Sequence, residues 1–127
     1  MAYQTIVAGV YPANASCELT GQLTDVDGTT PVPGSAITTL VLTLYEAVTG
    51  AVINACRQRV IDPVLVDGDG NLTLLLSAAD MALIGVPATG RPFVEGHVAL
   101  LEWTWASPVR AGRHWILFNV AEGPPVV

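Results

Sequence analysis

The chain has 127 residues, of which 51% are hydrophobic and 13% are charged, and its formal net charge is −6. This length supports one domain with a single core, and no apolar stretch approaches the roughly 20 residues that span a bilayer. The five arginines, unaccompanied by lysine, are scattered and form no basic stripe that could neutralise phosphates. We therefore expect no membrane partner and no specific nucleic-acid partner, and the apolar surplus predicts subunit contacts in a homo-oligomer.

The first residues, MAYQTIVAGVYPANAS, lack the basic region and the continuous apolar region of a signal peptide. We expect them to be folded sequence that forms a short N-terminal arm. Without a secretory signal, two buried free thiols at Cys17 and Cys56 are favoured over a disulfide between them.

The first clear strand pattern is CELTGQLT at residues 17–24, where apolar and polar residues alternate with a period of two. The next residues, 25–35, predict an exposed loop, because glycine and two prolines interrupt regular structure. In ITTLVLTLYE, residues 37–46, three leucines share one face while the other face is only moderately polar. This pattern predicts a long central strand.

Shorter strands are expected in the middle of the chain. Residues 51–54 predict the return strand of a short hairpin, and residues 60–66 predict another strand, broken by Pro63. The turn DGDGN leads into NLTLLLS, residues 71–77, whose alternate leucines predict one more strand.

One helical element is expected, and a capping box marks its start. Ser77 is followed three residues later by Asp80, which predicts a short helix or helical turn that ends at Gly85 and Pro87.

The last two predicted strands are EGHVALLEWTW, residues 95–105, and RHWILFNVA, residues 113–121. About seven short strands, separated by turns and accompanied by almost no helix, predict an all-β fold. The most natural architecture is an antiparallel immunoglobulin-like β-sandwich with one short helical turn. We expect a single domain over residues 1–127 that ends in a proline-containing C-terminal tail.

Residues 95–105 combine two glutamates, a histidine and two tryptophans, and are the strongest candidate for an active site. In a strand, however, Glu95 and Glu102 point to opposite faces and cannot converge on a sugar bond as the carboxyls of a glycosidase do. The nucleophile motifs of recognised hydrolase families do not occur, and two histidines supply little acid–base chemistry. We therefore expect no enzymatic activity, no catalytic residues and no cofactor.

The pairing of the last two strands decides where the histidines lie. Placing Trp103 opposite Ile116 makes one continuous apolar face. The same register sets Leu101 opposite Phe118, Ala99 opposite Val120, Trp105 opposite His114, and His97 near Glu122. It separates the two histidines by well over about 20 Å, so they are not expected to share a metal.

In this arrangement we expect Leu101 and Trp103 in the core and Trp105 at the end of the sandwich. Glu95 and His97 are expected where the strand emerges, hydrogen-bonded to a loop or to a neighbouring subunit. A solvated surface histidine is the favoured case for His97.

Two aspartate-rich turns, DVDG at residues 25–28 and DGDGN at residues 67–71, present oxygen ligands at alternate positions, as calcium loops do. Leu72 stands where an EF-hand needs glycine, and Ala78 stands where it needs glutamate. We expect plain turns and no metal site, with a weak ion held between the loops as the alternative.

Four segments, taken in chain order, resemble one family. They are LTDVDGTTPVPGSAITTLVLTLYEAVTGAVIN, DGDGNLTLLLSAADMAL, EGHVALLEWTW and AGRHWILFNV. Together they are similar to small β-sandwich proteins encoded among the structural genes of tailed bacteriophages, and the likeness covers about residues 17–120. The resemblance implies a virion component without catalysis, an immunoglobulin-like module repeated by symmetry that decorates the capsid or forms a ring in the head–tail connector or tail.

We therefore expect a structural protein of a tailed-phage virion, made in the host cytoplasm, with capsid decoration or cement as the preferred role. A head–tail connector or tail ring is the first alternative, and a carbohydrate- or receptor-binding module is the second. The second alternative depends on Trp115, whose side chain is expected to point away from the apolar face.

The expected partners are further copies of the chain and other virion proteins, namely the major capsid protein or connector and tail proteins. Loops carry recognition on a rigid sandwich, so contacts are expected in residues 25–35, in residues 87–93 and at both termini. The candidate assembly contacts are Asp25, Asp27, Pro31, Pro33, Arg91, Phe93, Glu95, His97 and Trp115.

Overall fold

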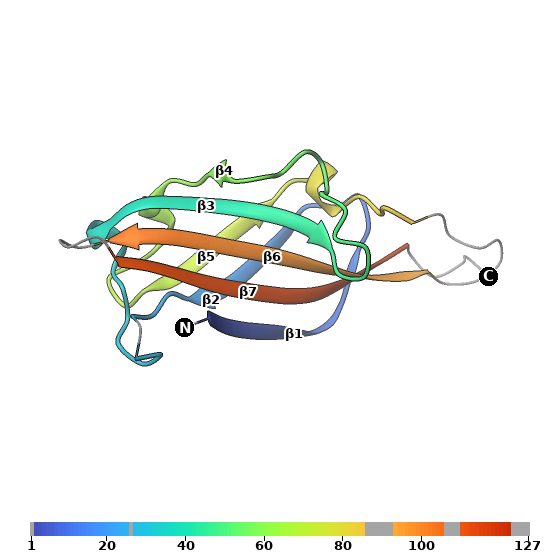
Figure 1. Cartoon of the computed structure of the whole chain (residues 1–127). Coiled ribbons are helices and arrows are strands. Elements are labelled where there is room, and N and C mark those ends of the chain that lie inside the picture. The colour runs from blue at the N-terminus through green and yellow to red at the C-terminus, as the bar shows by residue number, and fades with distance from the viewer. Residues whose placement is uncertain (1, 26, 86–92, 106–109, 123–127) are drawn as a thin grey trace.

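The computed structural model describes residues 2–25, 27–85, 93–105 and 110–122. Within these residues, seven strands and three short 3₁₀ turns form a β-sandwich (Figure 1). The strands are β1 (Ala2–Pro12), β2 (Cys17–Gln22), β3 (Ile37–Glu46), β4 (Arg59–Val60), β5 (Asn71–Leu76), β6 (Val94–Trp105) and β7 (Arg110–Ala121). The predicted all-β fold class is therefore confirmed.

Two sheets of unequal size make the sandwich. The larger sheet has the strand order β1-β7-β6-β3-β4, and the smaller sheet is the pair β2-β5. Figure 1 shows the smaller pair crossing behind the larger sheet at an angle to its strands. Buried residues of both sheets form one core, with Leu19 and Leu74 from the smaller sheet and Leu42 and Leu101 from the larger.

The strand patterns that were clearest in the sequence are found as strands. Along β5, buried and exposed residues alternate strictly, so that Leu72, Leu74 and Leu76 enter the core. The leucines of β3 are likewise buried, and the residues between them are half-buried on the second face. The two-residue period predicted these strands correctly, because each successive side chain of a strand leaves the backbone on the opposite side.

The N-terminal residues were expected to form an arm, and this expectation was wrong. They form β1, which lies at the edge of the larger sheet and pairs with β7 in parallel, from Ala2 opposite Arg113 to Pro12 opposite Ala121. The sandwich is therefore not wholly antiparallel. A shift of register between Ile6 and Val10, with Gly9 at a φ of +91°, breaks the alternation that would have marked this strand.

The expected strands at residues 51–54 and 60–66 were largely wrong. Val52 makes only an isolated bridge to Tyr45, and β4 comprises two residues. After β4 the chain enters a 3₁₀ turn, η2 (Pro63–Leu65), and the Asp62 side chain caps this turn by accepting a hydrogen bond from the Val64 N–H. Proline cannot donate to a ladder but fits the start of a helical turn, so Pro63 ends the strand.

The described residues contain three 3₁₀ turns, η1 (Gly34–Ala36), η2 and η3 (Ala79–Met81), whereas the sequence predicted a single helical turn. The turn η3 is the predicted one, and its capping box is confirmed. The Ser77 N–H donates to Asp80 Oδ2 at 3.0 Å, and the Asp80 N–H donates to Ser77 Oγ at 3.3 Å. The described part of the chain has no helix long and apolar enough to cross a membrane.

The expected register between β6 and β7 was wrong by four residues. Trp103 lies opposite Gly112, and not opposite Ile116, while Leu101 lies opposite His114. The physical reason is the size of the indole. A Cβ atom at position 112 would come within 2.5 Å of Trp103 Cζ2, so only glycine fits opposite this tryptophan. Because the shift is an even number of residues, each side chain still occupies its expected face.

Residues 25–35 were expected to be an exposed loop, and part of this segment is buried instead. Val32 and Gly34 are buried, and Val32 belongs to the core cluster. Cys17 and Cys56 are confirmed as free, buried thiols. Burial raises the pKa of both thiols, which disfavours the reactive thiolate.

Candidate functional site

The candidate site is the face of the five-stranded sheet that is turned away from the core, here called the outer face. Residues paired directly across neighbouring strands share a face, so the registers define rows that cross the sheet. One row comprises Gln4, Trp115, Leu100 and Thr43, and the next comprises Ile6, Leu117, Val98 and Tyr45. The outer face is therefore largely apolar at its centre.

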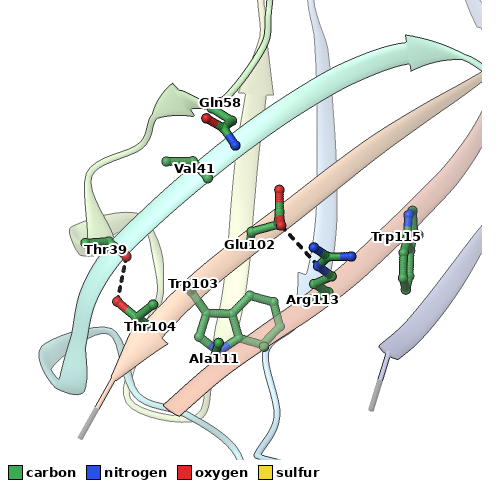
Figure 2. A pocket seen from close by; sticks show the side chains of 10 residues that line it. Thr39, Val41, Gln58, Glu102, Trp103, Thr104, Ala111, Arg113 and Trp115 are labelled. Carbon is green, nitrogen blue, oxygen red and sulfur yellow. Dashed lines mark hydrogen bonds and ion pairs between the residues drawn. The ribbon is translucent and has the colours of Figure 1, made fainter. Parts of the chain in front are cut away.

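A shallow hollow of about 460 Å³ lies on the outer face over β3, β6 and β7. Figure 2 shows Trp115 on one side of this hollow, Val41 and Gln58 on the other, and Glu102 with Arg113 between them. The volume is within the range of about 300–1,000 Å³ that is common for ligand pockets. The hollow is thus large enough for a small ligand or for a side chain of another protein.

The polar side chains of the hollow are already bonded in pairs. Arg113 Nε lies 3.0 Å from Glu102 Oε2 in an ion pair, and the hydroxyl oxygens of Thr39 and Thr104 are 2.6 Å apart (Figure 2). Pairs directly across a sheet are held in place by the strands themselves. A ligand would therefore meet Trp115 and a surface whose main polar groups have partners.

The interpretation of Trp115 as an outward-pointing residue is confirmed. Its neighbours His114 and Ile116 are buried on the inner face, whereas Trp115 is half-buried and lines the hollow. The hollow itself was not predicted, because its floor joins residues of three strands whose register had to be known first. The one available signal was the weakly polar second face of β3.

Glu95 and His97 were expected near the surface, and the solvated histidine was wrong, because the side chain of His97 is only 1% exposed. Glu95 accepts hydrogen bonds from the N–H groups of Ile84 at 2.9 Å and Gly85 at 2.7 Å. His97 Nε2 lies 2.6 Å from Glu95 Oε1. The expected hydrogen bond to a loop is thus present within the chain, and neither side chain is available for a surface contact.

Burial raises the pKa of Glu95, but the hydrogen bonds from Ile84, Gly85 and His97 together outweigh it, and the net pKa is lowered. His97 also packs edge-on against Phe118, with ring centroids 5.7 Å apart. The arrangement fixes residues 84–85 against β6 and holds a carboxylate in its ionised form. It is a structural link between a loop and a strand.

The sequence identified Asp80 only as part of a capping box, and its ion pair with Arg59 was not predicted. Asp80 binds Arg59 through two hydrogen bonds of 2.9 and 2.8 Å and accepts a third from Asn54 at 2.9 Å. Burial raises the pKa of Asp80, but these bonds and that from the Ser77 N–H outweigh it and hold the pKa far below its usual value.

The second histidine, His114, is buried and its Nε2 lies 2.7 Å from the hydroxyl of Thr5 on β1. Burial lowers its pKa, which favours the neutral ring. In the observed register His97 is four residues from Leu101, the residue opposite His114, a distance of about 13 Å along the strand. This is shorter than expected, yet no three His, Cys, Asp or Glu side chains of the described residues gather as a metal site would require.

Both aspartate-rich segments form turns held by their own side chains. Asp27 accepts the N–H groups of Thr29 and Thr30, each at 2.9 Å, and Asp67 accepts those of Asp69 and Asn71 at 2.8 and 2.9 Å. Hydrogen bonds from the side chain and backbone of Thr30, and then from Thr29, lower the pKa of Asp27 to about 2. Both segments are therefore turns, as expected.

The remaining candidate contacts are scattered over the molecule. Asp25 forms an ion pair with Arg110 at 3.0 Å, Pro31 is exposed and Pro33 is half-buried. Phe93 is half-buried beside Gly85. Arg91 and most of the loop at 87–93 lie outside the described residues. The candidate contacts that are described therefore do not form one continuous surface.

No family model, curated protein or solved structure matches this chain.

Proposed function

We propose that this chain is a non-enzymatic structural protein of a tailed-phage virion, which assembles in symmetric copies and decorates the capsid. The observation that carries the proposal is a set of large apolar side chains that remain exposed on several elements outside the core. Val60, Ile6 and Leu75 are 82%, 75% and 70% exposed, and Val48 and Val64 are similarly open. Exposed apolar patches on a small domain favour contacts with other protein surfaces.

The fold supports the same proposal. The pair β2-β5 packs against the order β7-β6-β3-β4. If the sandwich is immunoglobulin-like, as we propose, these would be strands B and E against G, F, C and C′. An immunoglobulin-like module repeated by symmetry is what the resemblance to phage structural proteins implies. Repetition of a modest contact many times gives firm attachment without a strong single interface.

The buried charged groups favour a structural role over catalysis. The carboxylates of Asp80 and Glu95 accept bonds from fixed partners, and Glu46 likewise accepts bonds from the N–H groups of Val48 and Thr49 and from the Thr49 hydroxyl. A catalytic acid or base needs a reacting group within hydrogen-bond reach. These carboxylates are instead committed to holding turns and loops.

There are two alternative functions, a second structural role in the virion and a ligand-binding role. A ring in the head–tail connector or tail would use the same type of contact, and the net charge of −6 favours the capsid exterior over a channel that contains DNA. A carbohydrate- or receptor-binding module would use the hollow beside Trp115. The paired state of Glu102 with Arg113 weighs against that alternative, because a sugar site needs polar groups that turn towards the ligand.

The test is to label purified tailed-phage particles from the source of this chain with antibodies raised against the recombinant protein. Label distributed over the head supports capsid decoration, and label confined to the neck or tail supports the connector or tail alternative. Particles that carry no label, and whose protein content by mass spectrometry lacks this chain, would contradict a virion function. Antibodies from the same animals before immunisation are the control.

A further inference from the structure

We propose that the outer face binds a second copy of this chain, face to face, with Trp115 at the centre of the contact. The inference deepens the proposed function, because it names the surface by which copies of an assembling protein meet. Its partner is identified by the chemistry of the face, which suits an identical face better than it suits a sugar or a charged protein.

The outer face carries apolar residues on every strand of the larger sheet, and the row that contains Val60 and Val41 continues to the paired Glu102 and Arg113. Ile6 on the edge strand β1 is followed across the sheet by Leu117, Val98 and Tyr45, of which Leu117 and Tyr45 are half-buried and Val98 is already buried in the single chain. Val60, on the opposite edge strand, lies beside Val41 on the same face. Ile6 and Val60 are among the most exposed apolar residues of the described chain, so both margins of the face remain unshielded.

The size of the face matches that of a stable interface. The two central strands β6 and β7 each have 12 residues. With a rise of about 3.3 Å per residue and about 4.8 Å between strands, the flat area over β1, β7, β6 and β3 is roughly 700 Å². Standard interfaces bury about 800 Å² on each partner, so the outer face alone provides nearly all the area that is needed.

The charge of the face favours contact with an identical copy. Among the outward-pointing described residues of the five strands, the charged ones are Glu102 and Arg113, which neutralise each other. The whole chain has a net charge of −6, so two copies that approach by other surfaces meet a repulsion that the outer face avoids. A two-fold axis brings the same patch of each subunit together, and a neutral patch is compatible with itself.

The hydrogen bonding of the face favours a dehydrated protein contact over a sugar. Glu102 with Arg113, and Thr39 with Thr104, can be covered without loss of their bonds. Covering an unpaired polar group costs free energy, and paired groups avoid most of that cost. Trp115 provides a large, half-buried aromatic surface of the kind that dominates the centre of protein interfaces.

The experiment compares native mass over a range of protein concentrations, by light scattering behind size exclusion, for the wild type and matched arginine variants. Trp115→Arg and Val60→Arg each place a charge on the outer face. Leu75→Arg places the same charge on the outward side of β5, in the other sheet, at a position that is also exposed. Circular dichroism and the Tm establish that each variant is folded.

We expect the wild type to form dimers, or assemblies in multiples of two, as its concentration rises. Trp115→Arg should weaken this association at least about 10-fold, Val60→Arg should weaken it less, and Leu75→Arg should leave it unchanged. Should Trp115→Arg fail to fold, Val60→Arg decides the question, because Val60 lies at an open edge and supports no core contact.

Two outcomes would overturn the inference. One is a wild type that is monomeric at every concentration. Sugar binding by this monomer that is lost in Trp115→Ala would then favour the binding-module alternative. The other is dissociation by Leu75→Arg while the outer-face variants stay assembled. Particle labelling tests the proposed function independently of this inference. A labelled virion with a monomeric protein contradicts only the dimer surface, and an outer-face dimer absent from particles contradicts only the virion role.

Discussion

On the inner face of β7, His114, Ile116 and Phe118 are buried, whereas on the outer face of the same strand Trp115 and Leu117 remain half-buried. Both faces carry apolar residues, but they differ in how far these residues are buried. The inner face is covered by β2 and β5, whereas in a single copy of the chain the described side chains of the outer face, Val98 excepted, remain at least partly exposed to solvent. Apolar residues on the inner face therefore stabilise the monomer, and those on the outer face are available for association.

The sharpest way to test this difference is to shorten one leucine on each face of β6. Leu101→Ala removes a fully buried side chain and should lower the free energy of unfolding by about 2–5 kcal/mol. Leu100→Ala, its neighbour on the outer face, should cost less than half as much, because Leu100 is only half-buried. Urea unfolding monitored by circular dichroism measures both. Equal losses would mean that the two faces are equally well packed in the monomer.

The Asp80 cluster should have the next largest effect, because it is buried and carries charge. Asp80→Ala removes the acceptor of Arg59, Asn54 and the Ser77 N–H, and should lower the free energy of unfolding by about 3 kcal/mol. Asp27→Ala, which removes a carboxylate from an exposed turn, is the control and should cost clearly less. A loss from Asp80→Ala no greater than that control would show that the buried pair contributes little.

Position 112 tests the fit between strands on the inner face. Gly112→Ala places a methyl group 2.5 Å from Trp103 Cζ2, so either β7 or the indole must shift, at a cost of about 1–3 kcal/mol. Gly68→Ala is the matched control, because a Cβ there has no atom within 4 Å. Thermal unfolding of the two variants provides the comparison, and an unchanged Tm for Gly112→Ala would contradict the observed register.

The smallest predicted effect is a pH dependence due to His114. Its pKa is lowered in the folded state, so the unfolded state binds the proton first, and stability should fall as the pH drops below about 6.5. Its buried Nδ1 has no hydrogen-bond partner among the described residues that could accept a second N–H. The slope should not exceed about 1.4 kcal/mol per pH unit.

His114→Gln should remove this part of the pH dependence when the free energy of unfolding is measured between pH 5 and pH 8, a range of about three units around the unperturbed histidine pKa. The carboxylates act in a different range. The pKa values of Glu95 and Asp80 are lowered, so their contribution is present above their unfolded pKa of about 4 and is lost only at lower pH. A variant that retains the full slope above pH 5 would show that another group is responsible.

The sequence predicted what depends on the local period of two, and it failed where distant segments meet. Alternating leucines placed β3 and β5 correctly, and the same parity placed Trp115 on the outer face. The register of β6 with β7 could not be found by matching apolar residues, because a shift by four residues preserves both faces. The size of Trp103 opposite Gly112 decided it.

The buried polar groups were the least predictable part of the molecule. Glu95 is buried because residues 84 and 85 fold over β6 and donate two N–H groups, a contact that no short pattern in the sequence encodes. Arg59 and Asp80 are 21 positions apart in the chain, and no short pattern in the sequence encodes their contact either. The alternation of side chains along each strand was enough to identify the residues of the outer face. The hollow could not be predicted without the register between the strands.

The most direct test of the central claim, that the outer face is covered by a second copy, is the accessibility of Trp115 to the neutral quencher acrylamide. Trp103 and Trp105 are buried in the core and should be protected at every protein concentration, whereas Trp115 is half-buried in the monomer. We expect the fluorescence of dilute protein to contain a quenchable part that is absent from Trp115→Phe, and this part should disappear as the protein associates. Trp115 fluorescence that stays equally quenchable while the native mass increases would contradict the account.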